Sequence, residues 1–123
     1  MVGFVVVSHS AKLAEGVVDL ARMMARETPI AAAGGLEDGS FGTSFEKISN
    51  AVDAVYSDDG VIILMDMGSA VMTAEMVIET MEGRKIVMAD CPIVEGAVTG
   101  TVSAESGSSL EEIMEDLEQV GAQ

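Results

Sequence analysis

The segment Phe-Val-Val-Val-Ser-His-Ser at residues 4–10 joins an uninterrupted apolar run to a short polar turn. An apolar run that is rich in β-branched residues and does not alternate with polar ones is typical of a strand buried on both faces of a parallel sheet. Three more apolar runs follow at residues 29–33, 61–65 and 85–89. The sequence therefore predicts four buried strands, with polar residues directly after the first of them.

Segments with helical spacing separate these runs, and their apolar side chains recur every three or four residues. These side chains are Leu13, Val17, Leu20 and Met24 in the first segment, Phe45, Ile48, Val52, Val55 and Tyr56 in the second, and Val71, Ala74, Ile78 and Met81 in the third. Ser10, Thr43 or Ser44, and Ser69 are the predicted helix caps. Strands that alternate with helices predict an α/β fold, here a doubly wound three-layer sandwich. Its central, mostly parallel four-stranded sheet has the expected order 2-1-3-4 and is flanked by helices.

Residues 94–104 carry two competing patterns. Val94, Val98 and Val102 are four residues apart, as on one helix face, while the segment 98–102 also alternates like a strand. We expect a helix. A second helix is predicted from Ser108 or Ser109 onward, and its acidic face is interpreted as a solvated surface rather than a specific docking surface.

Composition sets the class of protein. The 123 residues are 49% hydrophobic and carry 21 acidic against 6 basic side chains, for a formal net charge of -15. A chain of this length and apolarity indicates one folded domain, residues 1–123, and its charge argues against nucleic acid and anionic membranes as partners. Without an apolar stretch of about 20 residues or a signal peptide, we expect a cytoplasmic protein. The ten methionines are expected to fill the core.

The single histidine and the single cysteine limit the possible chemistry. One of each predicts no metal site and no internal disulfide. Cys91 is interpreted as a buried apolar residue rather than a reactive thiolate. The chain contains no phosphate-binding loop or dinucleotide motif, so no cofactor is expected in it.

His9 is the main candidate for a functional residue. Ligands of open parallel sheets bind beyond the carboxyl ends of the strands, where His9 follows the first strand and Asp66 the third. If these strands are neighbours, Asp66 can hold the Nδ1 proton and leave Nε2 of His9 as a nucleophile for a phosphoryl group. The helix start after Ser10 and the turn of Gly68 and Ser69 are suitable phosphate donors.

Two alternatives remain open at these positions. His9 can be a surface or satisfied polar group, and Asp66 can simply cap the next helix. Asp66 can also be the phosphorylated residue of a flavodoxin-like receiver or regulatory domain, which is not an enzyme. A receiver needs acidic residues after its first strand to hold Mg²⁺, however, and this chain has Ser-His-Ser there.

The segments VVVSHS at 5–10, GGLEDGSFGTS at 34–44 and MDMGSA at 65–70 together resemble the mannose-type EIIA domains of the bacterial phosphotransferase system. The short turn Asp-Met-Gly-Ser-Ala resembles the dihydroxyacetone kinase branch of that family more than its sugar transporters. The resemblance implies a phosphotransferase subunit in which His9 is phosphorylated by the phosphocarrier HPr and is oriented by Asp66. It also implies that Thr43 borders the phosphate, together with Gly68 and Ser69.

The same resemblance implies the partners. The phosphoryl group would pass from His9 to ADP on the DhaL subunit, and the regenerated ATP would phosphorylate dihydroxyacetone bound to DhaK. The nucleotide and its Mg²⁺ would belong to the partner subunit. Members of the family form homodimers, and this chain is similar to the single-domain form, without fused HPr-like or enzyme I-like domains. A negative charge would favour its approach to the basic rim of HPr.

Overall fold

The computed structural model describes residues 1–122 and contains the predicted parallel sheet. Its strands are β1 (Gly3–Ser8), β2 (Ile30–Gly34), β3 (Val61–Met65) and β4 (Ile86–Ala89). All neighbouring strands are parallel, and their order is β2-β1-β3-β4, which confirms the predicted topology. The strands begin and end within one residue of the predicted apolar runs.

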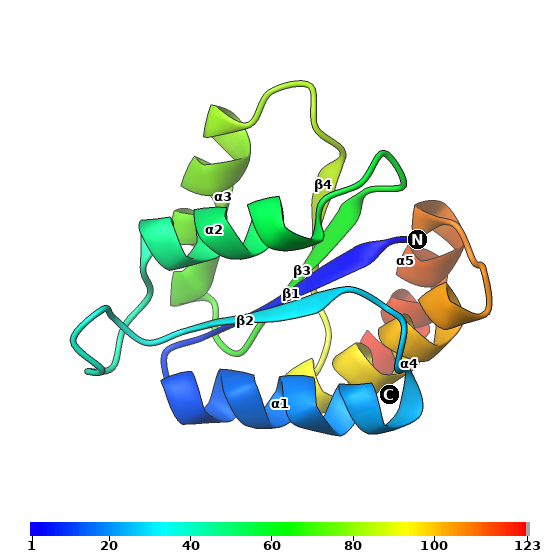
Figure 1. Cartoon of the computed structure of the whole chain (residues 1–123), viewed down its shortest axis with the longest axis horizontal. Helices are drawn as coiled ribbons and strands as arrows, with labels where there is room; N and C mark the ends of the chain where they lie inside the picture. Colours follow the sequence, from blue (N-terminus) through cyan, green and yellow to red (C-terminus); the bar gives the residue numbers. More distant parts are fainter. Residues whose placement is uncertain (123) are drawn as a thin grey trace.

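Five helices cover the two faces of this sheet (Figure 1). Helices α1 (Ala11–Met24), α4 (Ile93–Glu105) and α5 (Leu110–Gly121) lie on one face, and α2 (Phe45–Val55) and α3 (Ser69–Thr80) lie on the other. The expected three-layer sandwich is therefore confirmed. Of residues 1–122, none belongs to a helix that is long and apolar enough to cross a membrane.

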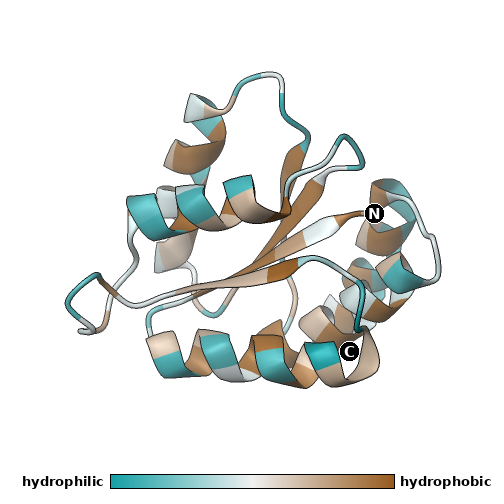
Figure 2. Ribbon diagram, in the orientation of Figure 1, coloured by the Kyte–Doolittle hydropathy of each residue, from teal (hydrophilic) through white to brown (hydrophobic). Residues whose placement is uncertain are grey.

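The strands contribute side chains to a hydrophobic core on each side of the sheet, because both of their faces are apolar (Figure 2). Phe4 and Val6 of β1 contribute to the cluster under α1, α4 and α5, while Val5 and Val7 contribute to the cluster under α2 and α3. All four side chains are fully buried. The continuous apolar run of β1 is thus explained by two cores rather than one.

Residues 94–104 form a helix, as expected, but the predicted apolar face was wrong. Val94 and Val102 are exposed, and the buried face of α4 consists of small residues: Gly96, Ala97, Gly100, Thr101 and Ala104. The reason is close packing. A Cβ atom added at Gly100 would lie 2.8 Å from Cε2 of the buried Phe4, so only a residue without a side chain allows this approach.

Two other predictions about side chains were also wrong. Six of the ten methionines are exposed, Met23 and Met72 among the most, and the other four are partly buried and pack against the edges of the two cores rather than filling them. Leu13, Leu20 and Met24 of the predicted α1 stripe are exposed as well, because α1 packs through Ala14, Val17, Val18 and Ala21. Small residues again bring the helix close to the sheet.

Candidate functional site

His9 and Asp66 meet at the carboxyl edge of the sheet. They directly follow β1 and β3, which are adjacent and aligned so that Val7 pairs with Met65. Nδ1 of His9 lies 3.1 Å from Oδ1 of Asp66, and the backbone N–H of His9 donates a hydrogen bond to Oδ2 at 3.0 Å. The predicted proximity of these two residues is confirmed, and the parallel pairing of their strands is its cause.

The Asp66 carboxylate is held by three donors and is only 11% exposed. Burial alone raises its pKa, but hydrogen bonds from the backbone N–H of His9, the Ser8 hydroxyl and the His9 ring lower the pKa by more. The net pKa lies below the ordinary value, so Asp66 is an anion near neutral pH. An anion can only accept hydrogen bonds, which makes it a suitable partner for a ring N–H.

The pairing with Asp66 fixes the tautomer of His9. Because the carboxylate accepts at Nδ1, the neutral imidazole carries its proton there and has a lone pair on Nε2. The hydroxyl of Ser69 lies 2.7 Å from Nε2 and donates to that lone pair. The imidazole is 22% exposed, so a reacting group can approach it from solvent.

Ser69 does not cap α3, contrary to the prediction. It is the first residue of the helix, the cap position belongs to Gly68, and no side chain caps this end. The Ser69 hydroxyl points to His9 instead. The caps expected for α1, α2 and α5 are confirmed, since Ser10, Ser44 and Ser109 accept from the N–H groups of Leu13, Lys47 and Glu112.

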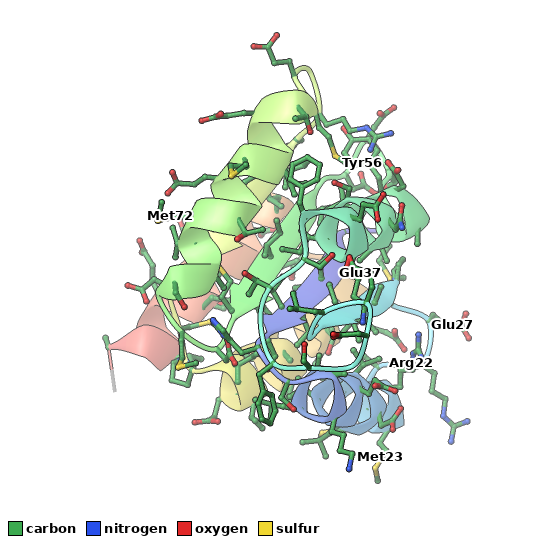
Figure 3. All side chains as sticks on the ribbon, turned by 90° about the vertical axis from the view of Figure 1, so that its left-hand side faces the viewer. Arg22, Met23, Glu27, Glu37, Tyr56 and Met72 are labelled. Carbon is green, nitrogen blue, oxygen red and sulfur yellow. The ribbon has the colours of Figure 1, made fainter. Side chains whose placement is uncertain are left out.

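The glycine-rich loop of residues 35–43 crosses the same edge of the sheet (Figure 3). Gly42 donates its N–H to the carbonyl of His9 at 3.0 Å, and Gly35 donates to the carbonyl of Ser8 at 3.1 Å. Gly35 has φ of +68°, a conformation that favours glycine. The loop is therefore tied to the backbone on both sides of the β1 terminus.

Thr43 lies at the end of this loop, but its hydroxyl is engaged elsewhere. It lies 3.0 Å from the hydroxyl of Thr73 on α3 and forms no hydrogen bond with His9 or Asp66. Thr43 thus links the loop to α3, whereas Ser69 directly contacts the imidazole.

Ser8 was predicted to lie at the end of the first strand but was given no role in the site, yet its hydroxyl donates to Oδ2 of Asp66 at 2.8 Å. The position of Ser8 in the strand could have indicated this contact. Ser8 ends an apolar strand two residues after Val6, on the same face of the sheet, and it is fully buried. A buried hydroxyl needs a partner, and the carboxylate after the adjacent strand is on that face.

Cys91 lies beside an open, mostly apolar hollow between the ends of β3 and β4, which Asp66 and Gly68 also border. Burial raises the pKa of its thiol, and the carboxylates of Asp90 and Glu95 raise it further. This environment disfavours a thiolate. Within residues 1–122, no group of three or more His, Cys, Asp or Glu side chains is arranged to hold a metal ion.

The fold and the paired imidazole and carboxylate define a small α/β domain with an oriented histidine at the carboxyl edge of its parallel sheet. The family model EIIA-man, described as the PTS system fructose IIA component, matches residues 3–114. The chain therefore belongs to the EIIA-man family. Its fold is similar to the crystal structure of a phosphotransferase system component EIIA from Streptococcus agalactiae, with a TM-score of 0.73, 12% identity and coverage of 99% of this chain and 93% of the other.

Within the family, the chain is similar to subunits named DhaM. It is 37% identical over 118 residues to the phosphotransferase subunit DhaM of the PTS-dependent dihydroxyacetone kinase of Lactococcus lactis, covering 96% of this chain and 94% of that protein. It is 39% identical to the phosphoryl donor subunit DhaM of Escherichia coli K12, over 94% of this chain. The match spans only 26% of the length of the Escherichia coli protein.

Proposed function

We propose that this chain is a phosphohistidine carrier, the DhaM-type phosphoryl donor of a phosphoenolpyruvate-dependent dihydroxyacetone kinase. His9 accepts a phosphoryl group from HPr and passes it to ADP bound on DhaL, and the ATP formed there phosphorylates dihydroxyacetone on DhaK. The observation that carries this proposal is the contact of 3.1 Å between Nδ1 of His9 and Oδ1 of Asp66. It supports a nucleophilic Nε2 in the only histidine of the chain.

The chemistry consists of two transfers. In the first, the Nε2 lone pair of His9 attacks the phosphorus of the phosphorylated donor, and the P–N bond of the donor breaks as the new one forms. Asp66 stabilises the positive charge that develops on the imidazole. In the second, a terminal phosphate oxygen of ADP attacks the same phosphorus, the bond to Nε2 breaks, and His9 returns to its neutral form.

The surrounding groups can bind the transferred phosphoryl oxygens. The hydroxyl of Ser69 already lies 2.7 Å from Nε2, so a rotation about its side chain would direct it at a phosphoryl oxygen. The N-termini of α1 and α3 begin just after Ser10 and Gly68 and present unpaired N–H groups and a positive dipole end. Thr43 is a further phosphate contact under this proposal, through a rotation that releases Thr73.

The experiment is phosphoryl transfer from labelled phosphoenolpyruvate with enzyme I and HPr. The wild type is expected to take one label that is labile in acid and stable in base, as a phosphohistidine is. His9→Ala should take none, and retention of the label by this variant would disprove the assignment. Cys91→Ser is the control, because burial raises the pKa of the Cys91 thiol and so disfavours the thiolate that a competing phosphoryl acceptor would need.

The same label tests the receiver alternative, in which Asp66 carries the phosphoryl group. An acyl phosphate is cleaved in base, whereas a phosphohistidine is stable in base and is cleaved in acid. The geometry favours His9, because both Asp66 oxygens are engaged by Ser8 and His9. Phosphorylation of Asp66 would sacrifice these bonds.

The proposal includes the assembly and location of the protein. We expect a homodimer in the cytoplasm, and sedimentation of the purified chain measures its mass. The net charge of -15 supports electrostatic attraction to a basic phosphocarrier. The rate of transfer from HPr should therefore fall as salt increases, because screening shortens the reach of the charges.

A further inference from the structure

Ser8 links the start of α1 to the Asp66 carboxylate. Its Oγ accepts a hydrogen bond from the backbone N–H of Ser10 at 3.0 Å and donates one to Oδ2 of Asp66 at 2.8 Å. A serine hydroxyl has a single hydrogen. The Ser10 N–H binds a lone pair of Oγ, and the Asp66 carboxylate can only accept, so the single hydroxyl hydrogen points to Asp66.

This bond determines which carboxylate oxygen faces the imidazole. Oδ2 of Asp66 receives two donors, the Ser8 hydroxyl and the His9 backbone N–H, so Oδ1 is left for Nδ1 of His9. The terminal torsion of an aspartate is intrinsically soft. Without the Ser8 hydroxyl, one backbone N–H would be the only other group that restrains the rotation of the carboxylate.

We infer that Ser8 is a positioning residue for phosphoryl transfer, acting through Asp66 to hold His9 in the tautomer with a free Nε2. The inference rests on the proposed function. Ser8 is fully buried and touches no reacting atom, so its effect reaches the imidazole only through the carboxylate. The conformation of Ser8 is itself fixed by its position as the last residue of β1.

Two measurements on untagged protein test the inference. The first is nitrogen NMR of the single imidazole at a pH where it is neutral, which reports the tautomer of His9 without overlap from other histidines. The second is the rate of label uptake from phosphorylated HPr. In Ser8→Ala, we expect a smaller fraction of the Nδ1–H tautomer and uptake that is about tenfold to a hundredfold slower, as for loss of a hydrogen bond to a charged group.

Matched variants separate positioning from folding. Ser8→Thr keeps the hydroxyl and should restore the wild-type tautomer and most of the rate. Ser103→Ala removes a similar serine hydroxyl bond, at 3.0 Å to Asp116 between α4 and α5, and should change neither measurement. Thermal unfolding of each variant shows whether that variant is folded. If Ser8→Ala does not fold, Ser8→Cys places a weak donor at the same position and should show the same two changes.

The outcomes distinguish this inference from the proposed function. If the wild type takes no label, the proposed function fails, while the NMR comparison still decides whether Ser8 sets the tautomer. If the wild type is labelled and folded Ser8→Ala keeps its tautomer and rate, the positioning role is wrong. It is equally wrong if the rate falls with no change of tautomer, whether or not Ser8→Thr restores the rate.

Discussion

The hydroxyl of Ser69 lies 2.7 Å from Nε2 of His9, while Asp66 holds the other nitrogen of the same ring. Each nitrogen of the imidazole therefore has a partner of its own, an anion at Nδ1 and a neutral donor at Nε2. Under the proposed function, the anion stays in place during transfer. The neutral donor would then move from the nitrogen to the phosphoryl group, which would give Ser69 a role in both states of the proposed carrier.

Ser69→Ala should lower the level of phosphorylated protein at equilibrium with HPr. Wild-type Ser69 loses a neutral hydrogen bond and gains one to a charged phosphoryl oxygen, a difference of about 1 kcal/mol. This corresponds to roughly a fivefold change in the equilibrium constant. Quantifying phosphorylated and free protein after the label has equilibrated measures it. Ser69→Thr retains a hydroxyl and is the control; equal levels in Ser69→Ala and the wild type would contradict a contact to the phosphoryl group.

Asp66→Asn should affect the rate far more strongly. An asparagine amide can donate to Nδ1, which moves the ring proton to Nε2 and removes the nucleophilic lone pair. A comparable tautomer change in a catalytic triad costs about 10⁴ in rate, so we expect a loss on the order of a thousandfold or more. Rapid mixing with phosphorylated HPr measures the rate. A loss below tenfold would show that the orientation of His9 does not depend on this carboxylate.

The alternation of side chains between the two faces of a strand explains how much of the site was predictable. Val7 pairs with Met65. The residues that follow them, Ser8 and Asp66, therefore lie on the opposite face of the sheet, which is the face of Val6 and Leu64. The proximity of His9 and Asp66 follows from strand order alone. The contact between Ser8 and Asp66 also follows from this alternation. Within an entirely apolar strand, however, the sequence does not distinguish the two faces, and the first polar residue appears only where the strand ends.

The helix faces were less predictable for a physical reason. In α4, the valine spacing indicated a buried stripe, but the sheet contacts glycine and alanine because they allow the backbone to approach Phe4. Hydrophobic periodicity reports which residues are apolar, but it does not report which side chains are small enough to pack closely against the sheet. Ser69 was correctly placed near His9, but its predicted role as a helix cap was wrong, because a serine at a helix start is equally suited to cap the helix or to reach a neighbouring side chain.

Glu105 should contribute stability that depends on pH and is independent of the site. Its Oε1 accepts hydrogen bonds at 2.9 Å from the backbone N–H groups of Glu27 and Thr28 and from the Thr28 hydroxyl. Burial raises its pKa, but these bonds lower it by more, to below the ordinary 4.5. The stabilisation is therefore fully present above pH 4.5 and is lost as pH falls through the lower folded-state pKa.

Comparison of the wild type with Glu105→Gln measures this effect, because glutamine keeps one oxygen and removes the charge. Urea unfolding should show a lower free energy of unfolding for the variant near neutral pH, with the gap closing below pH 4.5. Uptake of label by His9 should be unchanged, since Glu105 ends α4, away from the phosphoryl site. If the difference in unfolding free energy between wild type and variant grows as the pH falls, the pKa of Glu105 is raised rather than lowered in the folded state.

Gly16 and Gly100 make a matched test of the packing, since the same change to alanine should have opposite effects. At Gly16, on the exposed side of α1, a Cβ meets nothing within 4 Å, so Gly16→Ala should stabilise by about 0.5–1 kcal/mol through helix propensity. At Gly100, the Cβ would lie 2.8 Å from Phe4, and overpacking costs about 1–3 kcal/mol, which exceeds that gain. We expect Gly16→Ala to raise the melting temperature by about 2–5 °C and Gly100→Ala to lower it by about 3–5 °C for each kcal/mol of net destabilisation. Shifts of the same sign would mean that α4 does not pack against the Phe4 ring as closely as this fold requires.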